Sequence, residues 1–132
     1  MDQSQGKALQ LDVEHAAFIQ GAVSVVVSSR NSQHVPDVVR GCGCRITRDR
    51  RRVTVLVEAA RSGSVLENIA ANGLVAVVFS QPSTHRTIQL KGSDARLTRV
   101  TGADRVIAQR HLQAWVQDLQ LVGYGADFAR AV

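Results

Sequence analysis

The chain has 132 residues, of which 45% are hydrophobic and 4% are aromatic, and its formal net charge is +5. This length suits one domain with a single core, and the hydrophobic content excludes a largely disordered chain. No apolar run is long enough to cross a bilayer, and the first residues, "MDQSQGKALQLD", lack the apolar stretch of a secretion signal. We therefore expect one domain over residues 1–132, located in the cytoplasm without a membrane anchor.

The first predicted elements are a short helix and two strands. In "LDVEHAAFIQ" (11–20) the apolar residues share one side of a helix, and Asp12 is suited to cap its first turn. The segment "AVSVVVSSR" (22–30) is rich in β-branched residues and predicts a strand. A second strand is predicted in "VVRGCGCRIT" (38–47), where the glycines indicate a bulge or a close neighbour.

The two cysteines lie in this second strand. Cys42 and Cys44 are two residues apart, so on a strand they point the same way and cannot easily bond to each other. We interpret them as buried or half-buried thiols, with a redox pair as the alternative. No metal site is expected, because neither the cysteines nor His15, His34 and His111 have partners at metal-ligand spacing.

A basic cluster, "RITRDRRR" (45–52), carries much of the net positive charge. Asp49 predicts a hairpin turn inside it. Such a cluster can attract nucleic acid, although the chain has few aromatic residues on which bases would stack. A phosphorylated small molecule fits the charge equally well.

A third strand, "RVTVLVEAA" (52–60), leads into the segment "RSGSVLENIAANG" (61–73), which predicts a helix. Ser64 and Glu67 have the spacing of a capping box, in which a hydroxyl and a carboxylate satisfy amides at the helix start. Gly73 is expected to end this helix.

The rest of the chain predicts more sheet and a final helix. "LVAVVFS" (74–80) is a fourth strand, and "RTIQLKGSDARLTRV" (86–100) predicts one long bent strand or two. Thr101 and Asp104 repeat the capping spacing before the last helix. The apolar stripe of that helix consists of Ala108, Leu112, Trp115, Val116 and Leu119. Five or six antiparallel strands with few crossover helices favour a mainly β (α+β) small barrel.

Four segments in order carry a family resemblance, which covers about residues 18–100. They are "VTVLVEAA", "RSGSVLENIAANG", "LVAVVFSQP" and "HRTIQLKGSDARL". In this order the chain resembles the FMN-binding split barrel of the pyridoxamine 5′-phosphate oxidase-like family. The resemblance implies a six-stranded antiparallel split β-barrel with flanking helices, FMN as cofactor, and a homodimer with each flavin between the subunits.

The resemblance also implies a two-part site, with no catalytic residue assigned. A strand that feeds a helix presents free amides, so Arg61, Ser62 and Ser64 are expected to hold the FMN phosphate. Five polar residues are expected to meet the polar edge of the flavin ring, which needs hydrogen-bond donors. These residues are Thr84, His85, Arg86, Thr87 and Gln89.

Two departures separate the chain from true pyridoxamine phosphate oxidases. No lysine follows the third strand, and the final residues, "DFARAV", lack the arginine-leucine-proline substrate motif. The resemblance therefore implies a flavin-dependent oxidoreductase of another substrate. The alternatives are a barrel that binds a ligand or dimerises without catalysis, a basic barrel that binds nucleic acid, and a deazaflavin or haem in place of FMN.

A homodimer also follows from the strands themselves. "AVSVVVSS" and "LVAVVFS" carry apolar residues at both alternations, so they need cover on both faces of the sheet. A second copy of the chain is the simplest cover, since closed two-fold dimers are the commonest oligomers.

Overall fold

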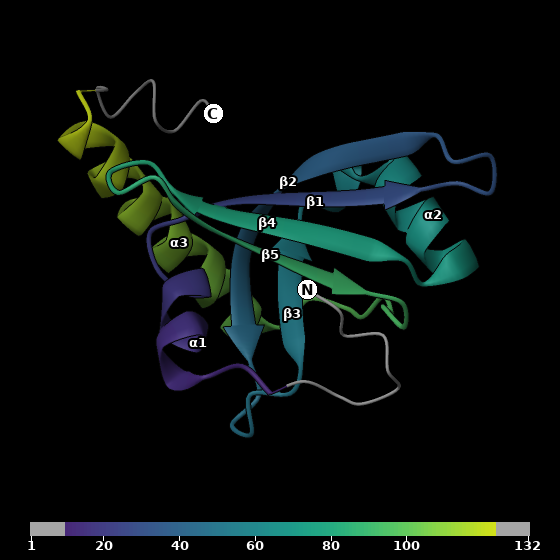
Figure 1. Ribbon diagram of the computed structural model, residues 1–132, viewed down its shortest axis with the longest axis horizontal. Helices are drawn as coiled ribbons and strands as arrows, with labels where there is room; N and C mark the ends of the chain where they lie inside the picture. The colour runs from purple at the N-terminus through teal and green to yellow at the C-terminus, as the bar shows by residue number, and fades with distance from the viewer. Residues whose placement is uncertain (1–9, 124–132) are drawn as a thin grey trace.

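One curled antiparallel sheet is the centre of the computed structural model, which describes residues 10–123 (Figure 1). Its strands are β1 (Ser24–Arg30), β2 (Pro36–Ile46), β3 (Val53–Val57), β4 (Val75–Gln81) and β5 (Arg86–Gly92). Their order across the sheet is β3-β2-β1-β4-β5, and every neighbouring pair is antiparallel. The protein is thus an α+β fold with an open sheet, whose edges are β3 and β5.

The expected sixth strand is absent from residues 93–100, so the described sheet has five strands where the sequence predicted six. After β5 the chain turns away from the sheet. The amide of Ala95 donates to the carbonyl of Gly73 at 3.0 Å, which ties this segment to the preceding helix and not to the sheet edge.

The inner face of the sheet forms the main core. Val25 and Val27 of β1 are opposite Phe79 and Val77 of β4, and all four side chains are buried. Because side chains alternate along a strand, these residues lie on one face. Both edge strands border the same core through partly buried residues, which are Val53, Val55, Val57, Ile88 and Leu90.

A β-bulge lies in β2, as its glycines predict. The register with β3 shifts between Gly41 and Gly43, which leaves Cys42 as the extra residue. At Gly41 the backbone passes so close to β1 that a Cβ atom would lie 2.7 Å from Cγ1 of Val25. Beyond the bulge, Cys44 returns to the inner face and is buried in the core.

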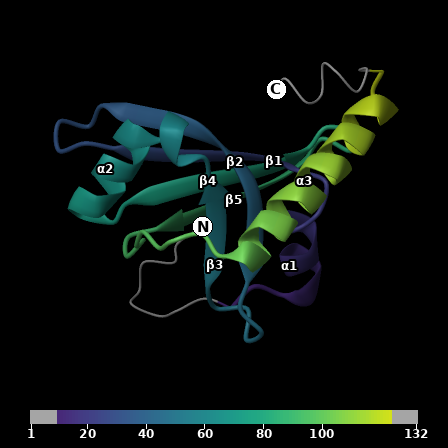
Figure 2. The same cartoon turned by 180° about the vertical axis from the view of Figure 1, so that it is seen from behind.

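Two helices close the inner face at opposite ends of the sheet (Figures 1 and 2). Helix α1 (Val13–Ile19) contributes Ile19 to the core, and α2 (Gly63–Asn72) contributes Val65 and Ile69. A short 3-10 turn, η1 (Ala59–Arg61), connects β3 to α2. The predicted caps of two helix ends are confirmed, since Asp12 caps α1 and Gly73 ends α2 in the left-handed conformation at φ 71°.

The third helix, α3 (Gly102–Leu121), crosses the outer face of the sheet beside β2 (Figure 2). Thr101 and Asp104 form the predicted capping box at its start. Asp104 is buried and also accepts a hydrogen bond from Nε of Arg45 at 2.7 Å, which fastens the helix to β2. Only part of the predicted apolar stripe is covered, since Trp115 is buried whereas Leu112 is 41% exposed. In the described residues, no helix is long and apolar enough to cross a membrane.

Candidate functional site

The predicted phosphate group lies where η1 leads into α2. Ser62 occupies the cap position of α2, but its buried hydroxyl donates backwards to the carbonyl of Glu58 at 2.6 Å and does not cap the helix. Ser64 is already inside the first helical turn and is exposed. The capping box predicted from Ser64 and Glu67 was therefore wrong, because the cap of α2 is Ser62 and the helix begins two residues earlier than that prediction requires.

The first turn of α2 presents amides that suit an anion. The first amide bonded to a preceding carbonyl is that of Leu66, which donates to Ser62 at 2.9 Å. Within residues 10–123, no acceptor is assigned to the amides of Gly63, Ser64 and Val65. Such amides and the helix dipole together favour negative charge at this end.

Arg61 directly precedes this helix start, and its side chain is 79% exposed. Its Nε lies 3.4 Å from a carboxylate oxygen of Glu58, and this ion pair is open to solvent. An exposed pair of this kind contributes little stability, so Arg61 is able to turn towards an anion. The nearby carboxylates of Glu58 and Glu67 oppose such binding.

The second predicted group surrounds a four-residue turn. Gln81 and Arg86 are opposite each other at the end of the β4–β5 hairpin, and Pro82 to His85 connect them. The hydroxyl of Thr84 donates to Oε1 of Gln81 at 3.0 Å and accepts from the amide of Arg86 at 3.2 Å. His85 has a φ of 59°, the left-handed conformation that closes the turn. The polar stretch therefore has a structural role in addition to any ligand that it binds.

A buried carboxylate on α3 holds this turn in place. Asp118 accepts from the hydroxyl of Ser83 at 2.7 Å, from its amide at 3.1 Å and from Nε2 of Gln81 at 3.2 Å. Three donors compensate for the burial of this carboxylate. No local pattern predicts this contact, because Asp118 is 35 positions from Ser83 and belongs to neither the capping nor the apolar pattern.

Residues of β5 divide between the two faces of the sheet. Arg86 lies on the inner side, where its guanidinium is 4.7 Å from the ring centre of Phe18 and 2.9 Å from Glu14 of α1. Thr87 and Gln89 are exposed on the outer side, with Thr87 bonded to Ser80 at 3.0 Å between hydroxyl oxygens. Arg86 thus holds α1 on the sheet and does not share a face with Thr87.

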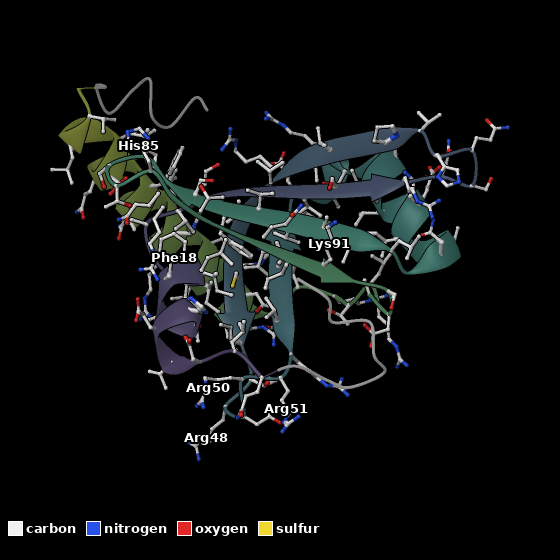
Figure 3. All side chains as sticks on the ribbon, in the orientation of Figure 1. Phe18, Arg48, Arg50, Arg51, His85 and Lys91 are labelled. Atoms are coloured by element: carbon white, nitrogen blue, oxygen red, sulfur yellow. The ribbon has the colours of Figure 1, made fainter. Side chains whose placement is uncertain are left out.

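The structure does not bring the eight predicted residues together within one chain. The phosphate group follows the edge strand β3, whereas the ring group belongs to the opposite edge strand β5. The β4–β5 turn lies beside α3, and α2 lies at the other end of the sheet (Figures 1 and 2). Figure 3 shows His85 at this turn, well separated from the arginines of the β2–β3 hairpin.

The surroundings of Cys42 and Cys44 favour the protonated form of both thiols. Burial raises the pKa of the Cys44 thiol to about 12. Burial, followed by the charge of Glu58, also raises the pKa of Cys42. A thiol must lose its proton to act as a nucleophile, so these environments disfavour the redox-pair interpretation.

Two cavities lie away from all eight predicted residues. One, of about 270 Å³, is lined by Gln20, Cys44, Ile107, Arg110, His111 and Ala114. His111 is partly covered here, and burial, followed by the charge of Arg40, lowers its pKa. The other cavity lies between α1 and the β2–β3 hairpin. The sequence indicated the arginines of this cavity as a basic cluster. It did not indicate that α1 packs against the hairpin and forms the other wall of the cavity.

Comparisons of the chain with models of protein families, with curated proteins and with solved structures found no match. The resemblance to the pyridoxamine 5′-phosphate oxidase-like family therefore stays a prediction from the four sequence segments. The final residues, "DFARAV" (127–132), which lack the arginine-leucine-proline substrate motif, lie outside the described residues.

Proposed function

We propose that this protein is a homodimeric FMN-binding oxidoreductase with a split-barrel architecture like that of the pyridoxamine 5′-phosphate oxidase-like family. The observation that supports the cofactor assignment is the start of α2, where three amides without assigned acceptors follow Arg61, whose side chain is exposed. FMN carries a phosphate that matches this donor set. When bound, FMN supplies the hydride or electron transfer, and the chain supplies binding and orientation.

The barrel assignment is supported by the way in which the sheet surrounds its core. Residues from all five strands border a single hydrophobic cluster, including Val55 of the edge strand β3 and Leu90 of the opposite edge strand β5. Figure 1 shows β3 running across the direction of β4 and β5, so the sheet curls over this cluster. The curl therefore fits a barrel that is split between its edges.

The homodimer is supported by the outer face of the sheet. Val38 is 67% exposed there, and Val26 and Val78 of the central strands are only half-buried. An apolar sheet face gains stability from cover, and α3 crosses this face beside β2. A second copy of the chain across a two-fold axis would cover the remainder.

The same dimer accounts for the separation of the predicted site residues. Thr87 and Gln89 lie on the outer face, which is the face assigned to the partner, whereas Arg61 and Ser64 lie beyond the opposite edge. In the proposed assembly, each flavin receives its phosphate contacts from one protomer and its ring contacts from the other. Arg86 contributes less to the proposed flavin site, because its ion pair with Glu14 must break before it can contact a ligand.

Replacing Arg61 with alanine is expected to weaken FMN binding about tenfold to a hundredfold, the value of one charge-assisted contact. Quenching of flavin fluorescence during titration measures this affinity. Arg51→Ala is the matched control, because Arg51 is an exposed arginine on the β2–β3 hairpin (Figure 3). An unchanged affinity in Arg61→Ala, or equal losses in both variants, would remove the phosphate assignment.

A further inference from the structure

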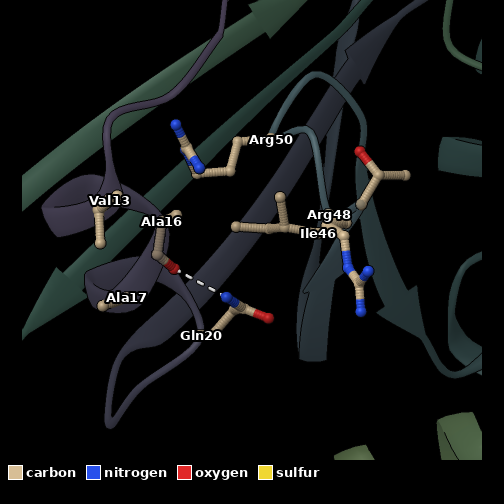
Figure 4. A pocket seen from close by; sticks show the side chains of 8 residues that line it. Val13, Ala16, Ala17, Gln20, Ile46, Arg48 and Arg50 are labelled. Carbon is tan, nitrogen blue, oxygen red and sulfur yellow. Dashed lines mark hydrogen bonds between the residues drawn. The ribbon is translucent and has the colours of Figure 1, made fainter.

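A cavity of about 290 Å³ separates α1 from the β2–β3 hairpin and combines an apolar floor with basic walls. Its lining residues are Val13, Ala16, Ala17, Gln20, Ile46, Thr47, Arg48 and Arg50. Figure 4 shows the side chains of Arg48 and Arg50 on either side of Ile46, opposite the helix. This volume is just below the usual range for small-molecule sites, about 300–1,000 Å³, so the cavity suits a compact ligand.

One of the two guanidinium groups is held in position by the backbone. Arg50 has a φ of 58°, and its Nε donates to the carbonyl of Leu11 at 2.8 Å. The amide of Leu11 donates in return to the carbonyl of Arg50 at 3.0 Å. Among the described residues, the terminal nitrogens of Arg50 have no assigned acceptor, so they remain available to a ligand at a fixed place.

The positive charge at this cavity is not neutralised by the carboxylates around it. Asp49 accepts from the hydroxyl of Thr47 at 2.6 Å and from the amide of Arg51 at 3.1 Å, both through Oδ1, so this carboxylate is bonded within the turn and forms no ion pair with Arg48 or Arg50 among the described residues. On α1, Asp12 accepts from the amide of His15 and Glu14 pairs with Arg86.

Neither Arg48 nor Arg50 has a carboxylate partner among residues 10–123. Two arginines therefore line a partly apolar cavity, with their side chains on opposite sides of Ile46 (Figure 4), and no acidic group is assigned to either of them.

We propose that this cavity binds a phosphate monoester of a compact apolar molecule. A phosphate monoester carries close to two negative charges at neutral pH, which matches two guanidinium groups. Guanidinium is planar and donates two parallel hydrogen bonds to such a group. The apolar floor favours a hydrophobic body on the ligand over a nucleic-acid backbone, which would leave that floor exposed to water.

This site is separate from the one proposed for FMN. None of its lining residues belongs to the eight predicted to bind the flavin, and its hairpin lies away from the β4–β5 turn (Figure 3). The two proposals therefore stand or fall independently. Arg61→Ala is expected to leave binding at this cavity unchanged.

Calorimetric titration with phenyl phosphate, inorganic phosphate and phenol tests the proposal. Phenyl phosphate is expected to bind saturably at about millimolar concentration or below, and more tightly than inorganic phosphate or phenol. Arg48→Gln is expected to weaken this binding roughly tenfold. Arg51→Gln removes the same charge from the same hairpin outside the cavity, and it is expected to keep the affinity.

A second variant tests the floor. Ala17 is exposed on α1, so Ala17→Glu is compatible with folding and places a carboxylate opposite the two arginines. It is expected to abolish the binding of phenyl phosphate while the circular dichroism spectrum is retained.

Several results would overturn the proposal. They are the absence of saturable binding, equal affinity for inorganic and phenyl phosphate, and equal losses in Arg48→Gln and Arg51→Gln. A DNA duplex that displaces phenyl phosphate and binds with steep salt dependence would instead assign the cluster to nucleic acid.

Discussion

Replacing Phe79 with alanine is expected to lower the free energy of unfolding by about 3–5 kcal/mol. Phe79 is 0% exposed and is the largest fully buried side chain described. It lies opposite Val25 on one side and Ile88 on the other, so its ring joins three strands of the core. The alanine variant loses this contact and leaves a cavity that rigid strands cannot fill. Urea denaturation followed by circular dichroism measures the loss.

Val38→Ala is the matched control for this substitution. It also shortens an apolar side chain on a strand, but Val38 is 67% exposed on the outer face. We expect its effect to be within about 0.5 kcal/mol, as for other exposed positions. If Phe79→Ala cost no more than Val38→Ala, the inner face would not be the main core.

Gly73→Ala is expected to cost about 2 kcal/mol or more, because two effects add. Gly73 has a φ of 71°, which side chains with a Cβ atom rarely adopt. A Cβ atom there would also lie 2.8 Å from the carbonyl oxygen of Ser93. Relief of this clash requires the segment that follows β5 to move away from α2. Chemical denaturation gives the change in stability, and the amide exchange of Ala95 reports that movement.

Gly63→Ala separates this effect from a general preference of helices for alanine. Gly63 begins the same helix, and a Cβ atom there would meet nothing within 4 Å. Alanine is the better helix former, so this variant is expected to be neutral or more stable by up to about 1 kcal/mol. Similar stability of both variants would contradict the left-handed end of α2.

Local signals in the sequence predicted the strands and helix ends that depend on few neighbours. Thr101 and Asp104 form the expected capping box, whereas Ser64 and Glu67 have the same spacing and do not. The difference arises before the helix. Because of the preceding 3-10 turn, α2 begins two residues earlier than predicted, and Ser62 bonds to the carbonyl of Glu58. No pattern of residue types reveals this.

The features that the sequence did not predict depend on contacts between segments that are far apart in the chain. Arg45 and Asp104 are 59 positions apart, and Ser83 and Asp118 are 35 apart, yet these pairs fix the place of α3. The chain beyond Gly92 was predicted as strand from its composition, but it bonds instead to the end of α2. The basic cluster was visible in the sequence, while its cavity depends on the packing of α1 against a hairpin.

Sedimentation velocity across a dilution series, recorded at the flavin absorbance as well as at the protein absorbance, tests the proposed function most directly. If each flavin is held by two protomers, the protein purified with FMN sediments as a dimer, and dilution releases monomer and flavin together. Arg61→Ala is expected to shift this release to higher protein concentration. A monomer that retains stoichiometric FMN, or a dimer that takes up none when FMN is added, would contradict the proposal.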